Sequence, residues 1–166
     1  DLARIWKKWG HDVYVMSSGG RLVKELVKCG VHHETLPIHV KSPFSLVLVP
    51  AVRNFIERER IDIVHARSRV PAWIGYFAAR AAHVPFVTTC HGYYSKHFMS
   101  RVMGWGKEVI AISKAIGRHM IDDFGVPPEK IHLIYRGIDL PRFSFDAGKY
   151  LRRPLKNRFV VVNIGR

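Results

Sequence analysis

The sequence predicts an α/β fold, built as a Rossmann-like, doubly wound parallel sheet. Short apolar runs rich in β-branched residues alternate along the chain with stretches of helical periodicity. The helical stretches are about 10 to 15 residues long, which suits crossovers between parallel strands. The apolar runs are continuous, as expected for strands that are covered on both faces. With 166 residues, of which 48% are hydrophobic, the chain is long enough for a domain with a sizeable core.

The first predicted unit is a strand, a glycine-rich turn and a helix. The strand at 12–17 ends in Ser-Ser-Gly-Gly, and the helix over 21–29 places Leu22, Leu26 and Cys29 on one face. Gly30 ends this helix, because glycine is common after the last helical turn. The turn either binds a phosphate or is only a tight connection, since a full glycine-rich phosphate motif is absent.

The alternation continues through the rest of the chain. A weaker strand is expected at 32–38, and the stretch after Pro43 becomes helical by Ala51, with Pro50 in the first turn or at a kink. Ser113 is expected to cap a later helix that ends at Gly125. Further strands are predicted at 61–66, 86–90, 108–113, 131–137 and 159–165, and a further helix at 71–82.

Charge and composition limit the function without naming it. The net charge of +14 favours an anionic partner, such as nucleic acid, acidic lipid or a phosphorylated small molecule, or simply makes a solvated basic surface. The longest uncharged apolar stretch, 43–52, is far short of the roughly 20 residues that span a bilayer, and no signal peptide opens the chain. We therefore expect a cytoplasmic protein. Cys29 and Cys90 lack the spacing of a zinc site or disulfide framework.

Polar and glycine residues follow the predicted strands. In an open parallel sheet the carboxyl ends of the strands lie along one edge, where ligands bind. Arg67 and Arg69 suit recognition of an anion or sugar, or belong to a solvated loop. His91 is followed by a glycine that lets a ligand approach the backbone, so it is a candidate catalytic residue or a structural one. The full set is Ser17 to Gly20, Arg67 to Arg69, His91 with Gly92, Ser113, Arg136 with Gly137, and Gly165 with Arg166.

Four motifs in this order resemble the N-terminal, acceptor-binding domain of family 4 of the retaining glycosyltransferases, which have the GT-B architecture. The motifs are "DIVHARS", "PFVTTCHG", "VIAISKAIGRHMIDDFGVPPEKIHLIYRGIDLPRF" and "VVVNIGR". The resemblance implies an enzyme that moves a sugar from a nucleotide-diphosphate sugar to a hydroxyl of a glycan or lipid-linked acceptor. The arginine-rich forms of two motifs, "HARSR" and "RGIDL", are most similar to those of bacterial members that build lipopolysaccharide or other surface polysaccharides.

The resemblance also implies roles for individual residues. His91 is the histidine of the family's T-x-H-G motif and would orient the donor sugar, and Arg136 stands where the family has asparagine. Donor binding is implied for Gly92, Ser113, Arg136, Gly165 and Arg166. We expect acceptor binding by Arg67, Ser68, Arg69, Tyr93 and Tyr94. No metal or other cofactor is expected, because cationic side chains would stabilise the leaving diphosphate.

The resemblance predicts a domain organisation as well. Residues 1–143 would form the acceptor-binding domain, 144–157 an interdomain linker, and 158–166 the first strand of a donor-binding domain. The family's first strand is missing from this chain, so we expect a fragment of a longer enzyme that is inactive alone. That strand belongs in the middle of the sheet, and its neighbours would pair with each other or leave exposed edges.

Other functions remain open at this stage. A non-enzymatic nucleotide- or sugar-binding module would share the same sheet edge. Nucleic-acid binding is disfavoured, because aromatic and basic residues are not interleaved along the strands. The run 95–107 predicts an interfacial amphipathic helix with apolar residues Phe98, Met99, Val102, Met103 and Trp105, or else a helix packed on the sheet. The first alternative would place the protein at the inner face of an anionic membrane.

Overall fold

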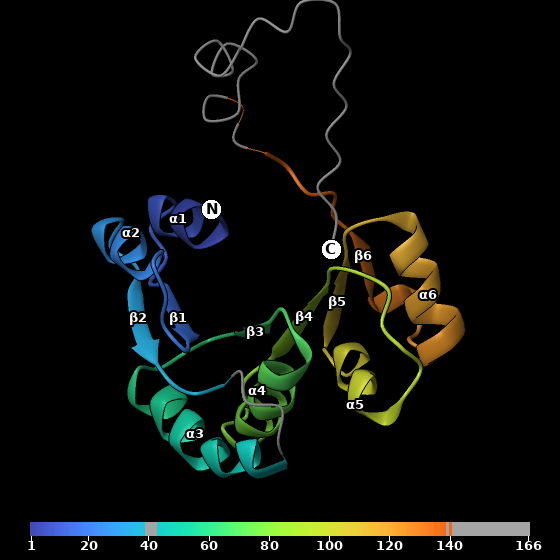
Figure 1. Cartoon of the computed structure of the whole chain (residues 1–166), viewed down its shortest axis with the longest axis horizontal. Helices are drawn as coiled ribbons and strands as arrows, with labels where there is room; N and C mark the ends of the chain where they lie inside the picture. The colour runs from blue at the N-terminus through green and yellow to red at the C-terminus, as the bar shows by residue number, and fades with distance from the viewer. Residues whose placement is uncertain (39–42, 139, 141–166) are drawn as a thin grey trace, which may run out of the picture. The chain divides into compact units, whose positions relative to one another are not determined.

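The computed structural model describes residues 1–38, 43–138 and 140 (Figure 1). Residues 1–135 form one compact unit, and residues 136–166 belong to a second. In the second unit, the described residues 136–138 and 140 are exposed and form no helix or strand. The predicted linker at 144–157 and the predicted strand at 159–165 lie outside the described residues.

Within residues 1–135, strands and helices alternate as the sequence predicts. The strands are β1 (Tyr14–Ser17), β2 (His32–Thr35), β3 (Val64–Ala66), β4 (Phe86–Cys90), β5 (Glu108–Ala111) and β6 (Ile131–Leu133). The helices are α1 (Leu2–Lys8), α2 (Val23–Lys28), α3 (Val49–Arg58), α4 (Arg69–Ala81), α5 (Phe98–Arg101) and α6 (Lys114–Phe124). Short 3-10 turns lie at η1 (Pro43–Leu48), η2 (Val102–Gly104) and η3 (Pro128–Lys130).

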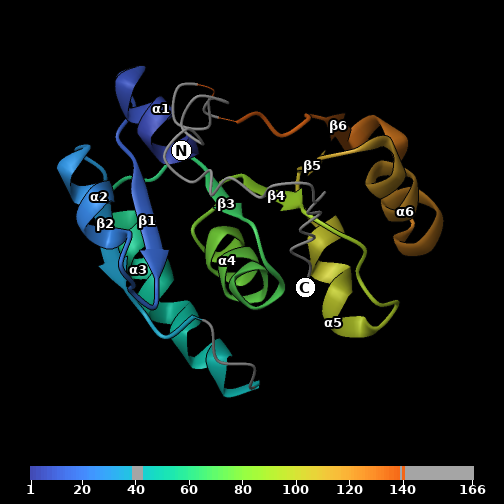
Figure 2. The same ribbon diagram turned by 45° about the horizontal axis from the view of Figure 1, so that its top comes forward.

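All pairs of neighbouring strands in these sheets are parallel, which confirms the predicted α/β class. Strand β1 pairs with β2, and β3, β4, β5 and β6 form a second sheet in that order (Figure 2). Ala66 lies opposite Thr88, and Cys90 lies opposite Ala111. Because the strands run the same way, the residues that follow β3, β4 and β5 meet at one edge of the sheet.

The two sheets are separated between β1 and β3. Among the described residues no backbone ladder joins these strands. Of the two predicted alternatives, the structure shows the one in which the neighbouring edges stay unpaired. Side chains bridge the break instead: the Tyr14 hydroxyl donates to Glu59 Oε2 at 3.2 Å, and the Trp6 and His65 rings lie 6.0 Å apart.

Helix α4 takes part in two hydrophobic clusters. Ala72 and Trp73 belong to the larger cluster, which also holds the buried residues of β4 and β5, whereas Ile74 and Ala78 belong to a smaller cluster with α3. A helix buried on two sides reads as largely apolar, as this stretch of sequence does. Burial of a side chain such as Ile74 stabilises the fold by about 1.5 to 3 kcal/mol. Helix α4 thus fixes the end of β3 from which it starts.

The predicted helix ends are partly confirmed. The Ser113 Oγ accepts the Ile116 N–H at 3.2 Å and caps α6, and Gly125 ends the helix with a left-handed φ of 66°. Pro50 lies in the first turn of α3, one of the two expected positions. Helix α4 begins at Arg69, two residues before the predicted start, because Ser68 takes the extended conformation of an N-cap.

The prediction of one amphipathic helix over 95–107 is wrong in its extent. Helix α5 has only 4 residues and passes directly into η2. Val102 and Met103, predicted on an interfacial face, are fully buried in the main core. The Thr88 hydroxyl donates to the Met103 carbonyl at 2.7 Å, so this backbone is tied to β4 and cannot continue a regular surface helix. Only the apolar side chains of Phe98, Met99 and Trp105 remain exposed from the predicted set.

Candidate functional site

The carboxyl ends of β3 and β4 bring Arg67 and His91 together. The Arg67 Nε–H donates to His91 Nε2 at 3.1 Å, one residue beyond the end of each strand. An imidazole nitrogen can accept only when it carries no proton, so this contact holds His91 as an acceptor at Nε2. The sequence predicted Arg67 and His91 as separate residues at the ends of two strands. In the structure they form one hydrogen-bonded pair.

A second pair lies two residues earlier on the same strands. His65 Nε2 and Thr89 Oγ1 are joined by a hydrogen bond of 2.7 Å between β3 and β4. Burial, with smaller contributions from the neighbouring Arg67 and His91, lowers the pKa of His65 to about 4. His65 is thus neutral near pH 7, and the positive charge beside His91 comes from Arg67 alone of these three side chains.

Arg69 and Tyr94 lie next to the Arg67–His91 pair. The Arg69 guanidinium lies over the Tyr94 ring at 5.8 Å and donates to Ser100 Oγ at 3.3 Å. The Tyr94 hydroxyl in turn accepts the His91 N–H at 3.3 Å. Burial raises the pKa of Tyr94, so its hydroxyl stays protonated. The Tyr94 ring therefore connects the start of α4 to the backbone that follows β4.

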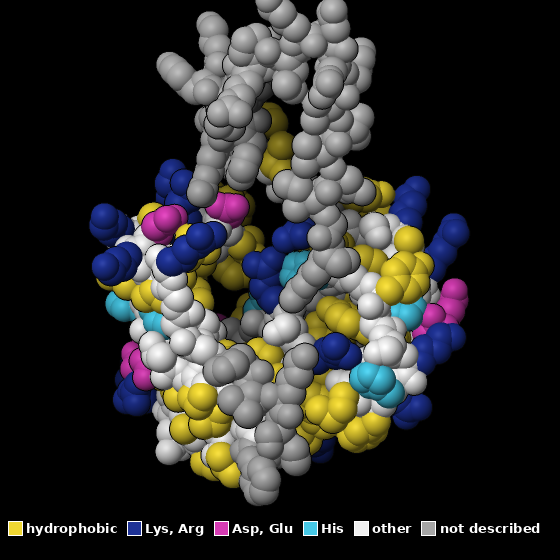
Figure 3. All heavy atoms as spheres, in the orientation of Figure 1, with side chains coloured by type: hydrophobic (Ala, Val, Ile, Leu, Met, Phe, Trp, Pro, Cys, Tyr) yellow, Lys and Arg dark blue, Asp and Glu magenta, His cyan; other side chains and the backbone are white. Residues whose placement is uncertain are grey.

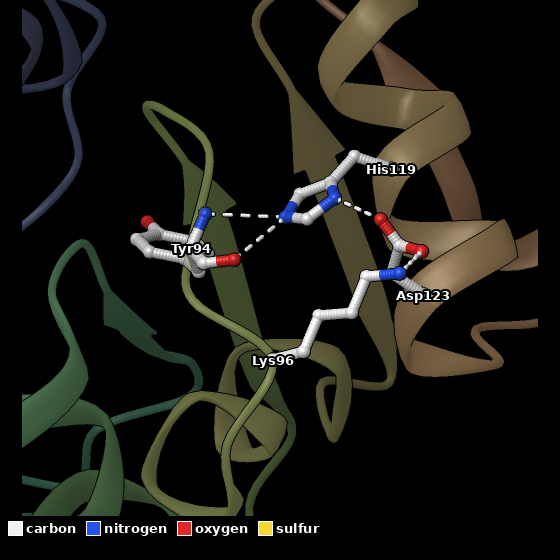
Figure 4. A network of polar contacts seen from close by, with 4 residues as sticks. All are labelled: Tyr94, Lys96, His119 and Asp123. Atoms are coloured by element: carbon white, nitrogen blue, oxygen red, sulfur yellow. Dashed lines mark hydrogen bonds and ion pairs between the residues drawn. The ribbon is translucent and has the colours of Figure 1, made fainter.

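Side chains of helix α6 contact the loop of residues 91–97, which follows β4 (Figure 4). His119 Nε2 lies 3.1 Å from the Tyr94 nitrogen and 3.0 Å from the Tyr94 oxygen, and its Nδ1 lies 2.5 Å from Asp123 Oδ2. Asp123 Oδ1 also pairs with Lys96 Nζ at 2.5 Å. Lys96, and to a smaller extent His119, lower the pKa of Asp123. The Tyr93 ring packs against His119 in a tilted arrangement, with the ring centroids 4.5 Å apart.

The structure connects five of the predicted site residues through contacts of their side chains. The connected set is Arg67, Arg69, His91, Tyr93 and Tyr94. The hydroxyl of Ser113 caps α6, and Gly92 has open space where a Cβ would stand. Ser68 is the N-cap residue of α4, and its side chain makes no capping bond. Arg136 belongs to the second unit, and Gly165 and Arg166 lie outside the described residues.

Several residues of this network were not predicted from the sequence. His65 and Thr89 lie inside strands, where they read as ordinary strand residues. His119 and Asp123 stand four residues apart on a predicted helix, and that spacing was the available signal, since it places them on one face. No group of three or more metal-ligating side chains was found in the described part of the chain. What this arrangement offers a ligand is hydrogen-bonding groups, a cationic edge and an exposed aromatic ring.

Comparisons with known proteins give one consistent result. A family model described as Glycosyltransferase Family 4 matches residues 1–142. A glycosyltransferase from Rickettsia africae ESF-5 superposes with a TM-score of 0.75 and 32% identity, over 86% of this chain and 39% of that one. Anabaena Alr3699/HepE, solved with UDP and glucose, gives a TM-score of 0.70 and 20% identity, over 91% of this chain and 44% of that one.

A third solved structure extends the comparison. The lipopolysaccharide outer core galactosyltransferase WaaB, in its apo form, gives a TM-score of 0.59 and 14% identity, over 78% of this chain and 37% of that one. This chain thus spans less than half the length of each of the three proteins. A search of curated proteins gave no match.

Proposed function

This chain belongs to glycosyltransferase family 4, and from that premise we propose that it forms the acceptor-binding side of a sugar-transferring cleft. Its fold is one Rossmann-like half of the GT-B architecture. A donor-binding domain would supply the other side of the cleft. The proposed reaction moves a sugar, with retention of configuration, from a nucleotide-diphosphate sugar to a hydroxyl of a glycan or lipid-linked acceptor in surface-polysaccharide synthesis.

The observation that carries this proposal is the Arg67–His91 pair at the carboxyl edge of the sheet. Transfer breaks the bond between the anomeric carbon and the diphosphate, and negative charge grows on the leaving group. His91 touches the donor sugar and orients it by hydrogen bonding. Arg67 stabilises the position of His91 through the 3.1 Å contact and adds positive charge at this edge. These side chains bind and orient, and the chemistry needs no metal in this scheme.

The acceptor side of the proposed site is the loop of residues 91–97 with the start of α4. Arg69 and Tyr94 form a connected surface here, and the Tyr93 ring is 70% exposed. An exposed aromatic ring with a hydroxyl can pack on the apolar face of a sugar and hydrogen-bond at its edge. Anabaena HepE was solved with UDP and glucose, which supports a nucleotide sugar as the donor class here.

Replacing His91 tests the proposed function in a protein that joins this chain to a donor-binding domain. We expect His91→Ala to lower the transfer rate per folded molecule by about 100-fold or more, the usual cost of losing a positioned polar group in the transition state. Affinity for the nucleoside diphosphate, measured by calorimetry, should stay close to that of the unchanged protein. His132→Ala, a half-exposed histidine on β6, is the matched control. Normal transfer by His91→Ala would contradict the catalytic role, whereas absence of transfer by the unchanged protein would favour a non-enzymatic binding module.

We also propose peripheral contact with an anionic membrane through the exposed apolar side chains of α5. Phe98 and Met99 are 63% and 48% exposed, and the basic Lys96 and Arg101 flank them. Figure 3 shows hydrophobic side chains gathered on the surface where α5 lies in Figure 1. No helix among the described residues is long and apolar enough to cross a bilayer. Contact would therefore come from insertion of side chains and from attraction of the basic residues to acidic headgroups.

Liposome sedimentation tests this contact. We expect Phe98→Ser with Met99→Ser to reduce binding to vesicles of mixed neutral and acidic phospholipid by at least about fivefold, because about 1 kcal/mol of apolar insertion is lost per side chain. Val47→Ser, which replaces an apolar residue that is 71% exposed elsewhere on the surface, is the control. Unchanged binding by the double variant would rule out contact through α5, even if binding remains sensitive to salt.

A further inference from the structure

His119 is a buried histidine that was not among the predicted site residues. It nevertheless contacts the loop of residues 91–97, which carries several of them. Its side chain is 3% exposed, and the residue lies on α6. Asp123, one turn later on the same helix, contacts Nδ1 at 2.5 Å and so fixes the direction of the ring. Lys96 of the loop closes the network by pairing with the other oxygen of Asp123 (Figure 4).

The ring binds the loop backbone whether or not it carries a second proton. When Asp123 accepts the Nδ1–H of a neutral ring, Nε2 is left to accept the Tyr94 N–H at 3.1 Å. When both nitrogens are protonated, the Nε2–H can donate to the Tyr94 carbonyl at 3.0 Å. Both polar groups of the Tyr94 backbone are thus within reach of one side chain from another element.

This point of attachment connects to the proposed site in two directions. Toward the surface, the Tyr93 ring packs against His119 in a tilted arrangement, with the centroids 4.5 Å apart, and Tyr93 stays 70% exposed. Toward the sheet, the Tyr94 hydroxyl accepts the His91 N–H. A side chain that filled space alone would need neither the carboxylate partner nor the contact to a backbone amide.

We propose that His119, oriented by Asp123, is a positioning residue that fixes residues 91–97 and so holds the exposed Tyr93 ring in place for a sugar of the acceptor. This inference rests on the proposed function for its link to sugar transfer. The attachment of the loop to α6 stands on the contacts alone. The two parts are therefore tested by separate measurements.

Hydrogen exchange tests the attachment in a protein that joins this chain to a donor-binding domain. We expect His119→Ala to speed exchange of the Tyr94 amide roughly tenfold, equivalent to one lost hydrogen bond, while amides of β4 keep their rates. Asp123→Asn retains an oxygen for the Nδ1–H and should stay within about twofold of the unchanged protein. His132→Ala removes a surface histidine that pairs with Glu108 at 2.6 Å and serves as the control. Equal acceleration across the domain, or none at Tyr94, would overturn the attachment.

Kinetics test the link to the acceptor. We expect His119→Ala to raise KM for the acceptor roughly tenfold and to leave nucleoside diphosphate affinity unchanged. Tyr93→Ala should have the same effect, Tyr93→Phe a smaller one, and the His119→Ala/Tyr93→Ala double variant no more than either alone, because the two act as a unit. Faster exchange at Tyr94 with a normal KM would overturn the positioning role. Absence of transfer by the unchanged protein would overturn the proposed function and the sugar-binding part of this proposal, while the exchange result would still decide the attachment.

Discussion

His65 shows how a single residue beneath the site is affected by its surroundings. Its imidazole is largely removed from water, bonds to Thr89 across the strands, and stands near the positive charge of Arg67. Burial and the nearby positive charge both disfavour protonation of the ring. The hydrogen bond to Thr89 favours neither state, because the neutral and the protonated imidazole can both make it. The result is a pKa of about 4, well below the ordinary value of 6.5. His65 therefore keeps a fixed, neutral hydrogen bond beneath Arg67 and His91 at the strand ends.

This shift predicts a loss of stability on acidification. Because the folded pKa lies below the unfolded one, the unfolded chain binds more protons between about pH 6.5 and pH 4, so the free energy of unfolding falls as the pH falls through that window. The contribution of His65 between about pH 7 and pH 5 is at most about 2 kcal/mol. Urea unfolding at several pH values measures it.

Two variants of His65 separate titration from packing. His65→Gln keeps a partner for Thr89 and cannot titrate, so we expect a flatter pH dependence with near-normal stability at about pH 7. His65→Ala should flatten the dependence equally and also lower stability at every pH, because it leaves a cavity and an unbonded hydroxyl. A pH dependence between about pH 4 and pH 6.5 that is as steep in both variants as in the unchanged protein would refute the low pKa.

Part of the site could be predicted at the residue scale. Arg67 and His91 follow adjacent apolar runs, and the parallel arrangement of those runs is enough to place both at one edge. The contact of His119 with Tyr94 could not be predicted, because it depends on how α6 and the loop pack across a separation of 25 residues. Burial of His65 was missed for the same reason, since polar residues in short strands do not reveal which face they occupy.

At the scale of elements, Gly106 controls the entry into β5. A Cβ at this position would lie 2.5 Å from the Glu108 carbonyl oxygen and 3.3 Å from the Thr88 nitrogen. Neither atom belongs to a flexible side chain, so the strand backbone would have to shift. The close approach of this turn to β4 therefore requires a residue without a side chain.

Replacing Gly106 should accordingly destabilise the domain. We expect Gly106→Ala to cost about 1 to 3 kcal/mol and to lower the melting temperature by several degrees, as overpacking does. Gly92→Ala is the comparison, because no atom lies within 4 Å of its added Cβ, and its melting temperature should be nearly unchanged. Equal melting temperatures for the two variants would show that the β5 entry can relax without cost.

Elements with local signals were predicted more accurately than elements set by packing. Strand β4 has its predicted bounds, and α6 has its predicted serine cap and glycine stop, because these signals lie within the segment itself. The run 95–107 has a helical pattern of apolar residues, yet two of them enter the core and the helix ends after one turn. Tertiary contacts to Thr88 and Val126 decide that outcome, and they are absent from the local sequence.

At the scale of the whole unit, burial is distributed unevenly between the two sheets. Helices α1 and α2 contain no buried residue, and the buried side chains near β1 and β2 are Val13 and Val31. The main hydrophobic cluster lies between the sheet of β3 to β6 and the helices and turns packed on it, with Val109, Ala111 and Cys90 fully buried. Most of the hydrophobic stabilisation therefore belongs to residues 64–133.

The break between β1 and β3 has a consequence for cooperativity. Backbone ladders spread an opening from strand to strand, and among the residues that the structure describes no ladder crosses this break, so residues 1–38 can unfold as a separate foldon before the remainder. Native-state hydrogen exchange in rising denaturant should show β1 and β2 amides merging into one opening of lower free energy, and β4 and β5 amides into a later one. A single common opening would mean that Tyr14, Glu59 and the Trp6–His65 ring contact transmit unfolding as effectively as a ladder does. If unfolding occurs in two steps, mutations in residues 1–38 would change how often that segment opens while the sheet beneath Arg67 and His91 stays folded. The two parts could then accumulate mutations independently.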